Sequence, residues 1–120
     1  MGVIRRLRRA ITGPGHGERV RAVWNGAVLA ESDRPIVIEG NHYFPPEDVD
    51  WRYLEPSSRR SACPWKGAAS YYTAVVGEGR NEAAAWQYPE PLPAAAPIRD
   101  HLAFWRGVRV LAVEADERAA

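Results

Sequence analysis

The dipeptide Asn25-Gly26 restricts the fold of this chain more than any other short stretch of its sequence. It separates two apolar-rich segments, residues 20–24 and 27–31. A two-residue type I′ turn needs positive φ at both of its central residues, and Asn followed by Gly meets that need best. The sequence therefore predicts a β-hairpin over residues 20–31.

Turn-forming residues divide the rest of the chain into short pieces. Ten glycines and ten prolines in 120 residues leave little room for long helices, so we expect a mainly β protein with one short helix at most. The Pro45-Pro46 pair predicts an irregular loop over 41–51, and residues 55–58 are typical of a surface connection. We expect further strands at 36–39, 59–63, 68–76, 82–88, 104–105 and 108–113, a brief strand or turn at 51–54, and a short helix or turn at 94–102.

The length of the chain indicates a single domain with a core that needs no disulfides. We expect a basic extension at 1–17, a compact domain at 18–113 and a disordered tail at 114–120. Cys63 is the only cysteine, so an internal disulfide is excluded. The sequence has no apolar stretch of about 18 residues, so we expect a cytoplasmic protein without a membrane span.

Several well-known catalytic and cofactor motifs are missing from the sequence. These are the Gly-x-x-x-x-Gly-Lys-Ser/Thr phosphate loop, the Gly-x-Gly-x-x-Gly dinucleotide fingerprint, the Gly-x-Ser-x-Gly elbow and the Cys-x-x-Cys pair. The three histidines have no spacing typical of metal ligands. We therefore expect no metal and no cofactor.

Three residues are candidates for chemistry on a small anionic substrate. Cys63 is a nucleophile if a neighbour lowers its pKa, and otherwise an inert thiol. Lys66, the only lysine, follows a tryptophan at a glycine corner, where it meets either an anion or solvent. His42 lies three residues after Glu39, close enough for an acid–base pair. Asp48 and Asp50 offer the same chemistry or are simply solvated carboxylates.

Aromatic side chains exceed what a core of this size requires, and several stand beside prolines or glycines. This pattern favours a partly exposed aromatic pocket for a ring-shaped or cationic ligand. Core packing is the simpler role for Trp86 and Trp105. The expected lining is Tyr43, Trp65, Tyr71 and Tyr72, with Lys66, His42 and Cys63 close by.

Six short motifs together resemble one known family. They are Val-Trp-Asn-Gly at 23–26, Glu-Gly-Asn-His-Tyr-Phe-Pro at 39–45, Cys-Pro-Trp-Lys-Gly at 63–67, Ser-Tyr-Tyr at 70–72, Ala-Trp-Gln-Tyr-Pro-Glu-Pro at 85–91 and Ala-Phe-Trp-Arg-Gly-Val at 103–108. Over about residues 20–113 they resemble the bacterial family called domain of unknown function 427. Gln87, where an aromatic residue is common, and the arginine-rich extension depart from its pattern.

The resemblance implies a fold similar to the β-tent, with two antiparallel sheets that meet at an angle, as in Mss4-like proteins and the drug-binding domain of cereblon. Those relatives bind zinc through two cysteine pairs, so with one cysteine the zinc site is expected to be absent here. Cereblon-like domains hold cyclic ligands in an aromatic cage. The family is also labelled nucleotidyltransferase-like, but such enzymes need Gly-Ser before Asp-x-Asp, and here Asp48-Val49-Asp50 comes before Gly67.

The sequence therefore predicts a small β domain that binds a small cyclic or aromatic ligand in an aromatic-lined pocket. One alternative is an enzyme that acts through Cys63, Lys66 or His42. Another is a protein-interaction module that uses the arginine-rich extension. Nucleic acid is not an expected partner, because all basic residues but Lys66 are arginines throughout the chain, which points to codon bias. No oligomeric state is predicted.

Overall fold

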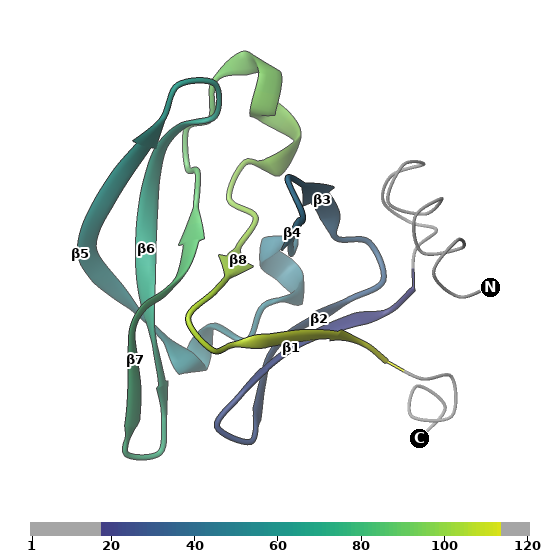
Figure 1. The fold of residues 1–120 in the computed structure, drawn as a ribbon, viewed down its shortest axis with the longest axis vertical. Coiled ribbons are helices and arrows are strands. Elements are labelled where there is room, and N and C mark those ends of the chain that lie inside the picture. Colours follow the sequence, from purple (N-terminus) through teal and green to yellow (C-terminus); the bar gives the residue numbers. More distant parts are fainter. Residues whose placement is uncertain (1–17, 114–120) are drawn as a thin grey trace.

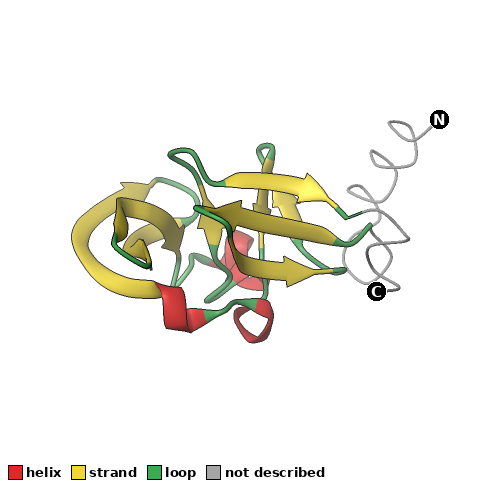
Figure 2. Cartoon of the chain, turned by 90° about the horizontal axis from the view of Figure 1, so that it is seen from below, coloured by secondary structure: helices red, strands yellow, loops and turns green. Residues whose placement is uncertain are grey.

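The computed structural model describes residues 18–113, so the expected extension at 1–17 and tail at 114–120 lie outside the described residues. Strands joined by tight turns dominate this range, and its longest helix is a six-residue 3-10 helix (Figure 2). The expected mainly β class is confirmed. In chain order the elements are β1 (Val20–Trp24), β2 (Ala27–Ser32), β3 (Ile36–Ile38), β4 (Asn41–Tyr43), η1 (Pro46–Asp48), η2 (Trp51–Tyr53), β5 (Leu54–Cys63), β6 (Gly67–Val76), β7 (Gly79–Gln87), η3 (Pro93–Ile98), β8 (Ala103–Phe104) and β9 (Arg109–Ala112).

The strands form three antiparallel sheets, with orders β2-β1-β9, β3-β4 and β5-β6-β7-β8. The four-stranded sheet stands on one side of the molecule and the three-stranded sheet crosses the base of the other side (Figure 1). The small β3–β4 hairpin lies above the three-stranded sheet and faces β8. Two antiparallel sheets were expected, and the structure has a third, the small β3–β4 hairpin.

The predicted hairpin at 20–31 is confirmed, and its turn has a second role. Asn25 and Gly26 have φ of 52° and 79°, as a type I′ turn requires. The Asn25 amide also donates to the Val76 carbonyl oxygen at 3.2 Å. A Cβ on Gly79 would lie 2.9 Å from that amide, so the glycine allows close contact between the two hairpin tips. This contact joins the two larger sheets.

A second type I′ hairpin replaces the start of the loop expected at 41–51. Glu39 and Gly40 have φ of 55° and 81°, and Ile38 pairs with Asn41 across them. The loop prediction was wrong for residues 41–43, because the chain-breaking prolines begin only at Pro45. From there the chain does leave regular pairing and continues through η1 and η2.

The surface connection expected at 55–58 is also replaced by strand. These residues lie within β5, which pairs with β6 on one side only and so forms an edge of the sheet. Pro56 is tolerated because an edge strand does not need every backbone N–H. The register shifts between Pro56 and Arg60, which marks a bulge in β5.

Buried side chains form two clusters on opposite faces of β6. The cluster called here the closed core joins the three-stranded sheet to one face of the four-stranded sheet and is almost entirely aliphatic and alanine, with the Phe44–Phe104 ring pair at 5.7 Å. The second cluster contains three tyrosines and lies between the other face of β6 and the β3–β4 hairpin. The closed core consists of Val20, Ala22, Ala27, Leu29, Ala30, Phe44, Val49, Leu54, Ala74, Ala84, Ala85, Leu102 and Phe104.

None of the helices in residues 18–113 is long and apolar enough to cross a membrane.

Candidate functional site

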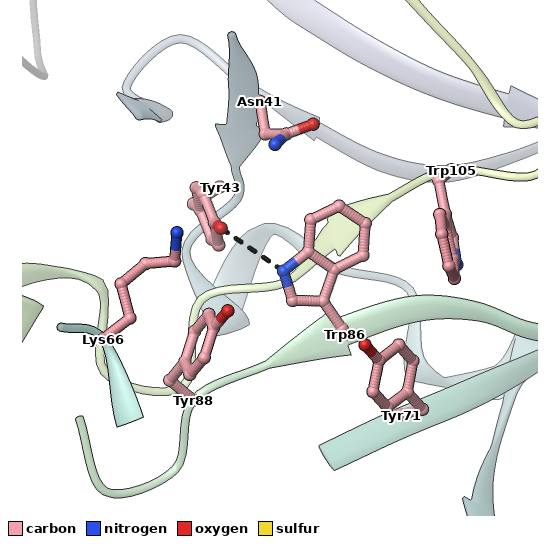
Figure 3. A pocket seen from close by; sticks show the side chains of 7 residues that line it. All are labelled: Asn41, Tyr43, Lys66, Tyr71, Trp86, Tyr88 and Trp105. Atoms are coloured by element: carbon pink, nitrogen blue, oxygen red, sulfur yellow. Dashed lines mark hydrogen bonds between the residues drawn. The ribbon is translucent and has the colours of Figure 1, made fainter. Parts of the chain in front are cut away.

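An open cavity of about 150 Å³ lies within the second cluster. Five of its seven lining residues are aromatic, and the other two are a lysine and an asparagine. Their side chains converge from β4, β6 and β7 and from residues just outside β6, β7 and β8 (Figure 3). This cavity is called here the aromatic cavity, and its lining is Asn41, Tyr43, Lys66, Tyr71, Trp86, Tyr88 and Trp105.

The two-residue periodicity of strands explains which side chains reach the cavity. Tyr71 on β6 pairs directly with Trp86 on β7, so their rings lie on the same face of the sheet. Tyr88 follows Trp86 by two residues and faces the same way. On β4, Asn41 and Tyr43 are also two residues apart and approach the cavity from the opposite wall.

Edge-to-face contacts hold the aromatic walls together. Tyr43 and Trp86 meet at 90° with ring centroids 6.1 Å apart, and the Trp86 indole N–H donates to the Tyr43 hydroxyl at 3.3 Å. Trp86 and Trp105 meet at 75° and 5.8 Å. The Trp105 indole N–H donates to the Ala83 carbonyl oxygen at 2.6 Å. The walls are thus fixed by hydrogen bonds as well as by ring packing.

The Cys63–Gly67 corner positions Lys66 at one end of the cavity. Gly67 has φ of +112°, and a Cβ there would lie 3.3 Å from the Glu90 carbonyl oxygen. Glycine therefore lets the segment after Tyr88 pack against the corner, where the Leu92 N–H donates to the Lys66 carbonyl oxygen at 2.9 Å. The β5–β6 turn and the proline-rich segment place Lys66 and Tyr88 side by side.

Lys66 is a buried cation with a single carboxylate partner among the described residues. Its side chain is 6% exposed, and its ammonium group bonds to Glu39, whose side chain is 54% exposed. Burial acts to lower the pKa of Lys66, but the bond to Glu39 and the neighbouring tyrosines outweigh it, so the pKa is raised. The bond to Lys66 lowers the pKa of Glu39. Both groups are therefore charged at neutral pH.

Two tyrosine hydroxyls at the cavity stay protonated. Burial raises the pKa of Tyr88 to about 12, and the neighbouring Tyr43 adds to this shift. Burial also raises the pKa of Tyr43, against the hydrogen bond from Trp86. At neutral pH both hydroxyls can donate hydrogen bonds.

Three of the seven residues expected at a ligand site line the cavity: Tyr43, Lys66 and Tyr71. Tyr72 follows Tyr71 on β6, so it faces the closed core, where its hydroxyl donates to Gln87 at 3.1 Å. His42 lies between two lining residues on β4 and faces away from them by the same alternation. Burial lowers the pKa of His42.

Trp65 and Cys63 flank the corner outside the cavity lining. The Trp65 ring is 4.8 Å from the Lys66 ammonium, its indole N–H donates to Glu39 at 3.4 Å, and 39% of the residue is exposed. Cys63 is half-buried and packs at the edge of the second cluster. The backbone N–H groups of Trp65 and Lys66 lower the pKa of its thiol, against the effect of burial.

Four lining residues were not predicted as part of the site: Asn41, Trp86, Tyr88 and Trp105. A signal for three of them was present in the sequence. Trp86 and Tyr88 stand two apart in a predicted strand, which puts both on one face. Asn41 stands two before Tyr43, but a loop was expected there. Trp105 had no such signal, because it reaches the cavity from beyond the end of β8.

The other charged candidates lie in arginine pairs. Asp50 accepts from Arg52 at 2.7 and 2.9 Å and caps the start of η2, and Asp48 lies 3.7 Å from Arg34. Glu39 pairs with Lys66, and no bond joins it to His42. Within residues 18–113, no group of three or more His, Cys, Asp and Glu side chains is arranged to hold a metal ion.

A family model described as a domain of unknown function, DUF427, matches residues 15–116 of the chain. The short name of that model, NTP_transf_9, refers to nucleotidyl transfer, whereas its description assigns no function. No curated protein matches the chain.

Proposed function

The chain belongs to the DUF427 family, and on that premise we propose that its aromatic cavity binds a small cyclic or aromatic ligand. The observation that carries this proposal is an open cavity of about 150 Å³ whose lining is aromatic on several sides. Ligand pockets are typically apolar and aromatic, with a few convergent polar groups. An apolar cavity of about 150 Å³ holds one benzene ring. The expected occupant is therefore a single ring whose substituents reach solvent.

Two polar groups of the lining support this assignment because the protein leaves them unused. The Tyr88 hydroxyl and the Asn41 amide have no hydrogen-bond partner among residues 18–113. No side-chain polar atom in this range is both fully buried and unbonded, so both groups are at least partly accessible to solvent, and both residues line the cavity. Ring-binding sites use such groups to orient their ligand.

The proposal is tested by titrating the full chain with single-ring compounds that include benzoate, benzamide, benzamidine and succinimide. Two-dimensional ¹H–¹⁵N NMR spectra report on the indole N–H groups of Trp86 and Trp105, which lie in the cavity wall. At least one compound should give saturable shifts of these two signals at millimolar concentration or below. If no compound of any charge saturates them, the cavity is not a ring-binding site.

A matched pair of variants on β4 separates cavity binding from general effects. Asn41→Phe places a ring in the cavity, whereas His42→Phe places the same ring on the other face of the strand. Binding should be lost in the first variant and retained in the second. Equal loss in both variants would mean that the shifts do not report on the cavity.

A second candidate function is a thiol-dependent reaction of Cys63 with a small anionic substrate, assisted by Lys66 or His42. The observation that favours it is the pair of backbone N–H groups, from Trp65 and Lys66, that lower the pKa of the thiol. Iodoacetamide should then alkylate the native protein at neutral pH faster than it alkylates the unfolded chain. Alkylation that requires denaturation would remove this candidate.

A further inference from the structure

The hydrogen-bonding capacity of the aromatic cavity is biased strongly toward donors. None of its seven lining residues is acidic, and one of them is a lysine. The Tyr88 hydroxyl and the Asn41 amide nitrogen are unused donors. Apart from hydroxyl groups, the only unused side-chain acceptor of the lining is the Asn41 amide oxygen. A ligand that satisfies this lining must be rich in acceptors.

Lys66 lines the cavity and has unused hydrogen-bond donors. An ammonium group has three N–H donors. Among the described residues, Lys66 donates only to Glu39, and its Nζ otherwise lies 4.8 Å from the Trp65 ring centre and 5.8 Å from that of Tyr88. Ring faces attract a cation but do not replace a hydrogen-bond acceptor. An acceptor from a ligand in the cavity would complete this environment.

Further positive charge lies beside the wall that contains Tyr71 and Trp105. The Arg59 guanidinium is 5.1 Å from the Tyr71 ring centre and 5.7 Å from that of Trp105, and Arg106 lies 4.5 Å from Trp105. Within residues 18–113 the Arg59 guanidinium has no hydrogen-bond or carboxylate partner. Cations already occupy positions over these rings, so the electrostatic environment opposes a cationic ligand and favours an anionic one.

We propose that the ligand of the aromatic cavity is a planar ring that carries an acidic group, a carboxylate or a phosphate, and that Lys66 and the Tyr88 hydroxyl bind this group. The inference rests on the proposed ring-binding function and adds the charge of the ligand to it. The ring lies between the aromatic walls, and the acidic group lies at the end of the cavity formed by the Cys63–Gly67 corner. Glu39 holds Lys66 in place from the solvent side, where its carboxylate is half-exposed.

The charge of the ligand is tested with three planar compounds of nearly the same shape. Benzoate, benzamide and benzamidinium differ mainly in charge, and isothermal titration calorimetry on the full chain measures the affinity of each. Charge-assisted hydrogen bonds are the stronger kind, so benzoate should bind at least about tenfold more tightly than benzamide, and benzamidinium most weakly. Phenyl phosphate and inorganic phosphate then show whether the acidic group is preferably a phosphate and whether the ring is needed.

The possible outcomes separate this inference from the function on which it rests. If benzamide or benzamidinium binds as tightly as benzoate, the ring-binding function stands and the inference about charge is wrong. If none of the compounds binds, both are wrong. If inorganic phosphate binds as tightly as phenyl phosphate, the site is an anion site without a ring requirement, which also contradicts the inference.

Two variants of the Lys66–Glu39 ion pair should change the affinity for benzoate in opposite directions. Lys66→Met keeps the length and burial of the side chain without its charge, and should remove the preference of the cavity for benzoate over benzamide. Glu39→Gln removes the competing carboxylate but keeps an acceptor for Lys66, so benzoate should bind more tightly, by about three- to tenfold. Benzamide should bind the wild type and Glu39→Gln equally. Unchanged or weaker benzoate binding by Glu39→Gln would contradict the role of Lys66 even if Lys66→Met fails to fold.

Discussion

Tyr71 and Tyr72 are neighbours on β6, yet their rings belong to regions that are packed in different ways. Tyr72 packs against the closed core, where aliphatic and alanine side chains fill the space between the two larger sheets. Tyr71 lines the aromatic cavity, where rings and unused polar groups surround an open space. Small apolar side chains interdigitate until no space remains. Rings held at fixed angles by hydrogen bonds cannot collapse into the space between them, so the cavity persists.

Removing a ring from the closed core should have the largest effect. Phe44 is fully buried and packs against Phe104 at 5.7 Å. Phe44→Ala should lower the free energy of unfolding by about 3–5 kcal/mol, because it removes apolar contacts and leaves a cavity. Urea unfolding followed by tryptophan fluorescence measures this change. A loss below about 1 kcal/mol would show that the closed core can collapse around the gap.

A methyl group added at the Cys63–Gly67 corner, which forms one end of the aromatic cavity, should have the next largest effect. Gly67→Ala should lower the free energy of unfolding by about 1–3 kcal/mol, because φ is +112° and the new Cβ would lie 3.3 Å from the Glu90 carbonyl oxygen. Gly26→Ala is the matched control, since it has φ of +79° and nothing within 4 Å. It should show only backbone strain, about 1 kcal/mol. Equal losses in both variants would show that the added methyl group does not disturb the contact between the corner and residues 90–92.

The two tyrosines of β6 offer a direct comparison of their regions. The Tyr71 hydroxyl bonds to Ser61 at 2.8 Å and the Tyr72 hydroxyl bonds to Gln87 at 3.1 Å. Replacing either tyrosine by phenylalanine should lower the free energy of unfolding by about 0.5–1.5 kcal/mol. Tyr71→Phe alone should also change the affinity for ring compounds, measured by calorimetry. A change in affinity with Tyr72→Phe would show that the two regions are coupled.

The smallest effect should be the pH dependence that comes from His42. Burial lowers the pKa of His42 below its ordinary value of 6.5 in the folded protein. The unfolded chain therefore binds this proton more readily, and the stability of the fold falls as the pH drops below about 6.5. His42→Asn removes this contribution, so the stability of the wild type relative to the variant should fall between pH 7.5 and 5. Parallel stability curves for the two proteins would contradict the shift.

Much of the fold could be predicted because local turn chemistry decides it. Asn25-Gly26 specifies a hairpin from its own turn chemistry. The strand at 82–88 was predicted despite its alanine run, and residues 82–87 of it lie in β7. The hairpin at Glu39-Gly40 was missed because Glu rarely takes positive φ, and there it has φ of 55°. The strand through Pro56 was missed because only the position of β5 at the sheet edge makes that proline acceptable.

The sequence by itself determined the class of the fold, the hairpin at Asn25-Gly26 and the presence of more aromatic rings than a core of this size needs. It did not determine which rings meet. Trp86 and Trp105 were expected in the core and Trp65 at the pocket, whereas Trp86 and Trp105 line the cavity and Trp65 flanks Lys66 from outside. The alternation of strand residues fixes the face of each side chain from local sequence. Sheet pairing, the approach of the β3–β4 hairpin and the glycine contact at the corner depend on residues far apart in the chain, so only the tertiary structure decided where those faces converge.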